Sequence, residues 1–225
     1  MKDFSMHECI IWGCAGHAMV LAETLAVRGA RVIALFDQNP VTSVIDGVPV
    51  FHGLSGFEDW ISSHPDPSRV TGFVAIGGHR GDDRLAIQQL FRDRGLRLAT
   101  ITHPLASVSP TASFGEGSQI LAQAVVAAAA RVGEACIINH KASLDHESIL
   151  GDGGHLAPGA TVCGCVNIGR NVMVGAGAVI LPRLSIGNDV LIGAGAVVIN
   201  DIPSGVVVVG NPAHIIRKSS QQKNR

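Results

Sequence analysis

Residues 156–198 read LAPGATVCGCVNIGRNVMVGAGAVILPRLSIGNDVLIGAGAVV, and an aliphatic residue recurs in this stretch at every sixth position. A small or modest residue stands two positions before almost every one of them, Leu184 being the large exception. The same frame runs without an insertion through the second half of the chain. Its sixth-position residues are Val108, Phe114, Ile120, Val126, Val132, Ile138, Leu144, Leu150, Leu156, Val162, Ile168, Val174, Ile180, Ile186, Ile192 and Val198.

A six-residue period with fixed apolar and small positions is typical of a parallel β-helix, in which three hexads form one triangular coil. An α-helix cannot produce this pattern, because its period is about 3.6 residues. The stretch therefore predicts about five coils, with the apolar residues pointing inward. A glycine recurs once per coil, and we expect these glycines to ease the corners. They are Gly115, Gly133, Gly151, Gly169 and Gly187.

The first hundred residues alternate strand-like and helix-like segments, which indicates a small parallel α/β domain of the Rossmann-like type. Asp46-Gly47 is a strong turn signal, and Ser55 followed by Glu58 resembles a capping box that opens a short helix. The expected strands cover residues 8–13, 31–37, 70–76 and 98–102, and the main helices cover residues 17–28 and 82–94. The predicted domains are residues 1–102 (α/β), 103–216 (β-helix) and 217–225 (flexible tail).

The composition argues against several classes of protein. Of the 225 residues 47% are apolar, so we expect a packed core and not a disordered chain. A net charge of −1 lacks the basic footprint of a nucleic-acid-binding protein. No stretch reaches the length of a membrane span. The five cysteines are an odd number and no signal peptide is recognised, which indicates reduced thiols in the cytoplasm.

Five short motifs connect the two parts of the chain to a known family. They are Ile10–His17 (IIWGCAGH), Phe36-Asp37, His103-Pro104, Asp145-His146-Glu147 and Val209–Ala213 (VGNPA). Together with the repeat they resemble the hexapeptide-repeat acetyltransferases, and among these the sialic acid O-acetyltransferase and sugar-nucleotide N-acetyltransferase family of the NeuD/PglD type. The resemblance implies a left-handed β-helix, a homotrimer and acetyl-CoA as co-substrate.

His146 is the candidate general base for acetyl transfer. It lies two residues after the inward Leu144, so it stands on a corner, and imidazole titrates near neutrality. Glu147 could accept the other ring N–H and hold the ring in place. Gly164 follows one full coil later at the same corner, and the resemblance implies that its backbone N–H stabilises the oxyanion. A solvated corner histidine is the simpler interpretation of His146, and the His-acid pair favours the catalytic one.

Other residues are predicted to contact acetyl-CoA and its acyl group. His155 lies nine residues after His146, half a coil away, so on one β-helix it cannot reach the same corner. The spacing therefore predicts a site shared between neighbouring subunits of a trimer. Asn139 matches an active-site position of the family, and Ala176 and Ala194 would keep the wall of the groove low enough for a pantetheine arm.

The α/β part is predicted to bind the nucleotide end of a nucleotide-linked sugar. Gly13, Gly16 and His17 lie in a Gly-rich turn between a strand and a helix, where helix amides attract phosphate. Asp37 ends the second strand at the place where such folds contact a ribose or base. Gly77 and Arg84 flank a longer basic turn that could add phosphate contacts. The resemblance implies a nucleotide sugar and not a dinucleotide, so no redox cofactor is expected.

The predicted activity is acetyl-CoA-dependent N-acetylation of a nucleotide-linked amino sugar, of the 4-amino-4,6-dideoxy type, for cell-surface glycan synthesis. An O-acetyltransferase acting on a sialic acid or other sugar is the alternative within the class. A zinc hydratase on the same fold is disfavoured, because His140, His146 and His155 do not match its ligand spacing. Cys163-x-Cys165 lacks the second pair that a tetrahedral zinc site needs, so no metal is expected. A non-enzymatic β-helix binding protein is the alternative from another class.

Overall fold

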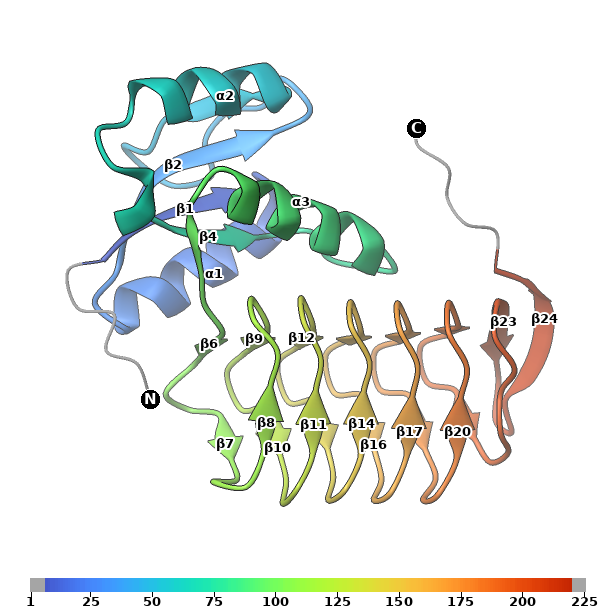
Figure 1. The fold of residues 1–225 in the computed structure, drawn as a ribbon. Helices are drawn as coiled ribbons and strands as arrows, with labels where there is room; N and C mark the ends of the chain where they lie inside the picture. Colours follow the sequence, from blue (N-terminus) through green and yellow to red (C-terminus); the bar gives the residue numbers. More distant parts are fainter. Residues whose placement is uncertain (1–6, 220–225) are drawn as a thin grey trace.

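The computed structural model describes residues 7–219, which form an α/β domain followed by a three-sided coil (Figure 1). We call residues 8–98 the front domain and the coil from residue 101 onward the prism. In Figure 1 the front domain lies over the first coils of the prism, and the later coils extend away from it. No helix in residues 7–219 is long and apolar enough to cross a membrane.

The front domain is built on a five-stranded sheet with the order β3-β2-β1-β4-β5, and every pair in it is parallel. Helix α1 packs on one face of the sheet, and α2 and α3 pack on the other. The elements are β1 (Glu8–Trp12), α1 (Gly16–Val27), β2 (Arg31–Asp37), β3 (Val50–His52), α2 (Gly53–Ser63), the 3-10 turn Pro67–Arg69, β4 (Thr71–Val74), α3 (Gly81–Asp93) and β5 (Arg97–Leu98).

The alternation of strands and helices predicted for this domain is confirmed, with two local corrections. The strand expected over residues 98–102 is divided: β5 pairs with β4 in the front sheet, whereas Ile101–Thr102 (β6) already pairs with a prism strand. Ser55 does not cap α2, because β3 runs directly into that helix through Gly53, whose φ of +61° makes the turn. Ser55 therefore lies inside the first turn of the helix.

Three sheets make the walls of the prism, and through residue 198 each strand pairs in parallel with the strand 18 residues away, as Val125 does with Ser143. The first wall holds β7 (Ser107–Val108), β10 (Val125–Val126), β13 (Ser143–Leu144), β16 (Thr161–Val162), β19 (Val179–Ile180) and β22 (Val197–Val198). The second holds β8 (Ser113–Phe114), β11 (Arg131–Val132), β14 (Ile149–Leu150), β17 (Asn167–Ile168) and β20 (Ser185–Ile186). The third holds β6 (Ile101–Thr102), β9 (Gln119–Ile120), β12 (Ile137–Ile138), β15 (His155–Leu156), β18 (Met173–Val174), β21 (Leu191–Ile192), β23 (Val206–Val209) and β24 (His214–Lys218).

The sixth-position residues line the interior of the prism, as the period predicts. Those from Ile120 to Val198 are buried, and Val108 and Phe114 pack partly buried against the same core in the first coil. At the far end β24 pairs antiparallel with β23. Arg217 and Lys218, which were expected to begin a flexible tail, lie in this strand, and residues 220–225 are outside the described chain.

The repeating glycines are needed for a different reason from the one expected. None of the five has a positive φ, so the corner does not require their conformational freedom. Each instead lies against the backbone of the next coil, so that a Cβ at Gly115 would meet the backbone of Gly133 and Glu134. The left-handed turn positions are held by other residues, including Ala129, Glu147 and Cys165.

Candidate active site at the corners of the prism

His146 lies at the corner between the first and second walls of the prism, just after β13. Its side chain is 53% exposed, so the imidazole points out of the prism. Its Nδ1 lies 3.3 Å from Oε2 of Glu147, and its backbone N–H donates to Oδ1 of Asp145 at 2.7 Å. A carboxylate at Nδ1 keeps that nitrogen protonated in the neutral ring, which leaves Nε2 as the free base.

Gly164 occupies the same corner one coil along, and its Cα supports the ring of His146. A Cβ at this position would overlap Nε2 and Cε1 of the imidazole, so only glycine lets the ring adopt its place. Within the described residues the backbone N–H of Gly164 has no hydrogen-bond partner. A proton acceptor and an unused N–H donor thus lie side by side, which is the pair of groups that acyl transfer requires.

Cys165 is a fourth member of this corner, which the sequence did not assign to the site. Its Sγ lies 4.0 Å from Nδ1 of His146 and 3.7 Å from Oε2 of Glu147. Glu147 and Cys165 occupy the same turn position in successive coils, with φ values of 58° and 61°. The 18-residue spacing between them was the signal that could have identified this neighbour.

Asn139 and His155 lie together, away from the His146 corner. Nε2 of His155 is 3.4 Å from Nδ2 of Asn139, and Nδ1 is 3.3 Å from the carbonyl oxygen of Gly78 in the front domain. His155 is only 5% exposed. Burial, reinforced by the charge of Arg84, lowers its pKa to about 3. It is therefore a neutral histidine under the front domain.

Ala176 and Ala194 lie at a different corner from His146, between the third and first walls. Both are exposed, and the turn is held by Gly195 N–H donating to the carbonyl oxygen of Ala176 at 2.9 Å. Within one chain the predicted acyl-site residues thus fall into two groups. His146, Glu147 and Gly164 form one group, and Asn139, His155, Ala176 and Ala194 follow the third wall.

The Gly-rich turns of the front domain meet at the carboxyl ends of β1 and β4. These strands are neighbours, with Trp12 paired to Val74, and the chain goes to opposite sides of the sheet after them. Such a switch point is where parallel α/β sheets bind ligands. The positions of Gly16 and Gly77 face open space. Only glycine suits position 13, because its φ is 107° and because a Cβ there would strike the backbone of Ala75.

Asp37 braces the first of these turns from the end of β2. Its Oδ2 accepts the backbone N–H of Cys14 at 2.9 Å, and its Oδ1 accepts that of Asn39 at 2.9 Å. His17 is turned toward the prism, where its Nε2 lies 2.7 Å from Oε1 of Gln119. Burial lowers the pKa of His17, so the ring is neutral.

Arg84 does not lie at an open phosphate site, which corrects the sequence interpretation. It is 1% exposed, and its guanidinium donates to backbone carbonyls of both regions. Nε donates to Ala135 at 2.8 Å and Nη2 to Gly153 at 2.5 Å, while Nη1 donates to Ile76 at 3.1 Å. Burial lowers its pKa to about 10. The arginine fastens the front domain to the prism instead.

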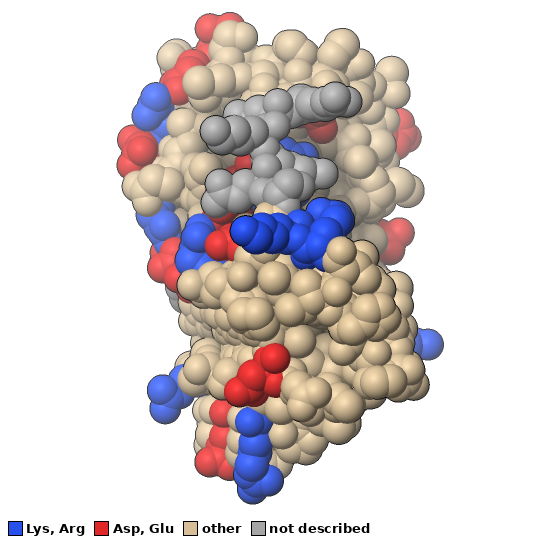
Figure 2. Space-filling model, turned by 90° about the vertical axis from the view of Figure 1, so that its right-hand side faces the viewer, with Lys and Arg blue, Asp and Glu red and all other residues tan. Residues whose placement is uncertain are grey.

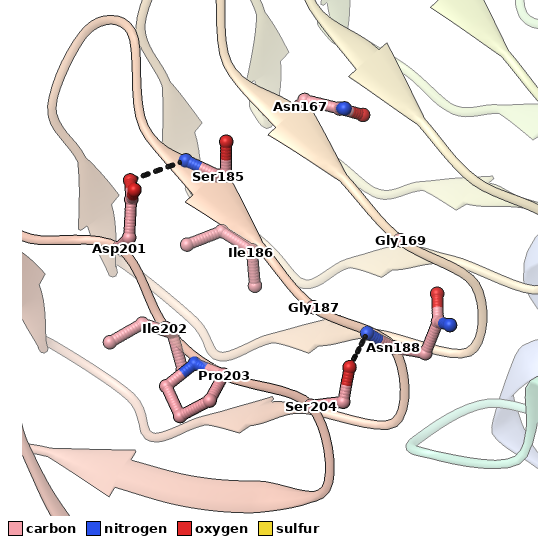
Figure 3. Close-up of a pocket in the computed structure, with 10 residues that line it drawn as sticks. All are labelled: Asn167, Gly169, Ser185, Ile186, Gly187, Asn188, Asp201, Ile202, Pro203 and Ser204. Carbon is pink, nitrogen blue, oxygen red and sulfur yellow. Dashed lines mark hydrogen bonds between the residues drawn. The ribbon is translucent and has the colours of Figure 1, made fainter.

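A hollow of about 560 Å³ opens on the second wall near the last coils (Figure 3). Its polar groups already serve the backbone: Asp201 accepts the N–H of Ser185 at 2.8 Å, and Ser204 accepts that of Asn188 at 2.9 Å. None of the predicted catalytic residues lines it. The hollow is therefore separate from the His146 corner.

A prism of hexapeptide coils with a histidine and an acid at one corner defines the class of hexapeptide-repeat acyltransferases. Residues 165–200 match the model for the bacterial transferase hexapeptide, and residues 8–84 match the PglD N-terminal domain. The chain belongs to the hexapeptide-repeat acetyltransferases of the NeuD/PglD type.

Two solved structures resemble the chain over nearly its whole length. One is the acetyltransferase domain of PglB from Neisseria gonorrhoeae with acetyl coenzyme A, at 32% identity and a TM-score of 0.84, covering 94% of this chain and 100% of that one. The other is PerB from Caulobacter crescentus with CoA and GDP-perosamine, at 33% identity and a TM-score of 0.85, covering 94% of this chain and 98% of that one.

Proposed function

We propose that this protein transfers the acetyl group of acetyl-CoA to the amine of a nucleotide-linked amino sugar. The observation that carries the proposal is the His146 imidazole, which lies between the Glu147 carboxylate and the Gly164 backbone. Support for the substrates comes from the similar PglB domain with acetyl coenzyme A and from PerB with CoA and GDP-perosamine. The switch point of the front domain is the proposed site of the nucleotide.

The proposed reaction uses Nε2 of His146 as general base. The sugar amine attacks the thioester carbonyl and gives its proton to Nε2, while Nδ1–H donates to Glu147. The N–H of Gly164 stabilises the negative oxygen of the tetrahedral intermediate. The intermediate then expels the CoA thiolate, which takes the proton from Nε2 of His146 and leaves as the free thiol. The products are the N-acetyl sugar nucleotide and CoA.

We infer that the active enzyme is a trimer whose sites lie between subunits. The two groups of acyl-site residues are on different corners of one prism, and a neighbouring prism could bring them together. Aliphatic side chains such as Val125 and Ile149 are exposed on the walls. Exposed aliphatic side chains suit a surface that pairs with another copy. Figure 2 looks onto the far end of the prism, and the walls that carry these side chains run away from the viewer there.

Mixing two inactive variants tests the shared site. His146→Ala removes the base, and Ala194→Trp fills the proposed pantetheine groove at the other corner. If a site takes one corner from each of two subunits, mixed trimers contain some sites with both corners intact and recover part of the activity. Mixed trimers that stay inactive would mean that one subunit supplies the whole site.

The place of action is proposed to be the cytoplasm. All five cysteines are free, and Cys9 and Cys14 are buried without a disulfide partner. Free thiols are the rule in a reducing compartment. Acetyl-CoA and nucleotide sugars as substrates agree with that location.

A substrate panel with acetyl-CoA tests the activity. GDP-, UDP- and dTDP-linked 4-amino-4,6-dideoxy sugars and free sialic acid are each incubated with the enzyme, and CoA thiol release and product mass are measured. We expect an N-acetyl product from at least one sugar nucleotide. His146→Gln should lower kcat by about 10²–10⁴ while CoA binding survives. Acetylation of the sialic acid hydroxyl alone would assign an O-acetyltransferase instead.

A further inference from the structure

Three different donor atoms converge at the His146 corner. Nδ1 of His146, Oε2 of Glu147 and Sγ of Cys165 all lie within 4.8 Å of one another. Their separations are 3.3 Å for N to O, 4.0 Å for N to S and 3.7 Å for O to S. A tetrahedral zinc ion with ordinary bond lengths needs about 3.4, 3.6 and 3.5 Å for these pairs. Shifts of a few tenths of an ångström would therefore close a three-ligand site.

The backbone of the prism holds these donors in place. Glu147 and Cys165 share the left-handed turn position of successive coils, so their side chains leave the corner in the same direction. The N–H of Cys165 donates to the carbonyl oxygen of His146 at 2.9 Å, which fixes the spacing of the two coils. The side chains of His146 and Glu147 are 53% and 67% exposed, so a fourth position is open to water.

We propose that this corner binds zinc or a similar soft divalent cation, and that the bound cation inhibits the enzyme. The inhibition, though not the binding, rests on the proposed role of His146. A thiolate and an imidazole select zinc or cobalt over magnesium, which prefers oxygen ligands. The sequence predicted no metal, because the histidine spacing does not match a zinc hydratase and Cys163-x-Cys165 lacks a second pair. The structure pairs Cys165 with a histidine and a glutamate instead.

The chemistry of binding explains the inhibition. Cys165 loses its thiol proton to solvent as the sulfur–zinc bond forms, and Nδ1 of His146 gives its lone pair to the metal. The ring proton must then reside on Nε2, the nitrogen that accepts the substrate proton in the proposed reaction. Glu147 is also occupied by the metal. The base is therefore protonated at the wrong atom for as long as zinc is bound.

Cobalt and zinc titrations of the full-length protein test the site directly. Co²⁺, added without oxygen, should give a thiolate-to-metal charge-transfer band, and calorimetry with Zn²⁺ should show tight binding, whereas Mg²⁺ gives neither. Cys165→Ser should abolish the band and weaken zinc binding by at least the roughly 10- to 100-fold typical of losing a supporting group. Cys163→Ser is the matched control, since it removes a nearby thiol outside the cluster and should keep both signals.

Activity with and without zinc tests the inhibition, with each variant compared with its own zinc-free rate. We expect zinc to inhibit the wild type and Cys163→Ser, a chelator to restore activity, and Cys165→Ser to resist. Equal loss of binding in both cysteine variants, or a band that survives Cys165→Ser, would overturn the site and leave the proposed function intact. Zinc bound through Cys165 without loss of activity would overturn the inhibition and count against His146 as the base.

Discussion

The front domain and the prism build their cores in different ways. In the front domain the ring of Trp12 lies 6.0 Å from that of Phe36 and 5.6 Å from that of Phe57, and these rings come from three separate elements. In the prism, apolar side chains stack at the same position of every hexad, so that each coil contributes one to each of the three walls. A repeating core is visible in the sequence as a period, whereas an aromatic cluster depends on contacts that no period records. This difference decides how far each region can be predicted.

Polar groups join the two regions, in addition to the apolar contact that Leu121 and Ile137 of the prism make with the α1 side of the front-domain core. Arg84 spans them with its five backbone carbonyl acceptors, and His17 and His155 each pair across the same boundary. Asn171 Oδ1 accepts the N–H of Gly81 at 2.9 Å, at the start of α3. We call this boundary between the front domain and the prism the joint. Substitutions in the joint test whether the two regions act as one body.

The largest expected effect on stability follows from removing Arg84. Arg84→Met keeps most of the apolar stem but leaves the backbone carbonyls of Ile76, Gly78, Ala135, Gly153 and Gly154 without their shared donor. A loss of about 3–5 kcal/mol in the free energy of unfolding is expected, because buried polar groups lose their partner. Urea unfolding of the full chain measures it.

The matched control is Arg94→Met. Its side chain is 39% exposed and pairs with Glu58 at 2.7 Å, so the cost should stay below about 1 kcal/mol. Equal stability of the two variants would mean that Arg84 does not fasten the joint. Weaker nucleotide binding without any loss of stability would restore the phosphate role that the sequence suggested.

The sequence predicted the prism well because each coil repeats the same physical demand. Burial at Leu144 implies burial at Val162, and a shift of 18 residues predicts that His146 and Gly164 meet. The same arithmetic applied to Glu147 leads to Cys165. Arg84 could not be placed in this way, because a basic residue after a Gly-rich turn has the same local sequence whether it faces solvent or a second domain. The capping box predicted at Ser55 was wrong for a similar reason. Helix α2 begins at Gly53 because β3 runs directly into it, and the local sequence does not record this constraint.

A smaller effect, confined to catalysis, is expected for Gly164→Ala. The new Cβ would displace the His146 ring, and a base misplaced by about 1 Å can cost roughly 10²-fold in kcat. The backbone should tolerate alanine, because Ala128 holds the same turn position two coils earlier. Steady-state kinetics and thermal unfolding on one preparation separate the two effects. A large drop in Tm, or an unchanged kcat, would contradict the role given to this contact.

The smallest effect is a pH dependence that should be located at the joint. The folded protein keeps His155 neutral, with its pKa lowered to about 3 by burial and by Arg84, whereas the unfolded chain titrates near 6.5. Below about pH 6.5 His155 is protonated in the unfolded chain but stays neutral in the folded protein. The free energy of unfolding is therefore full above this pH and falls toward pH 3. Between pH 6.5 and 5 the loss is at most about 2 kcal/mol. His155→Gln should flatten this slope in urea unfolding, while the exposed His214→Gln should leave it unchanged. A slope that is unchanged in His155→Gln would contradict the role given to His155, and it would point to His17, whose pKa burial also lowers at the same boundary.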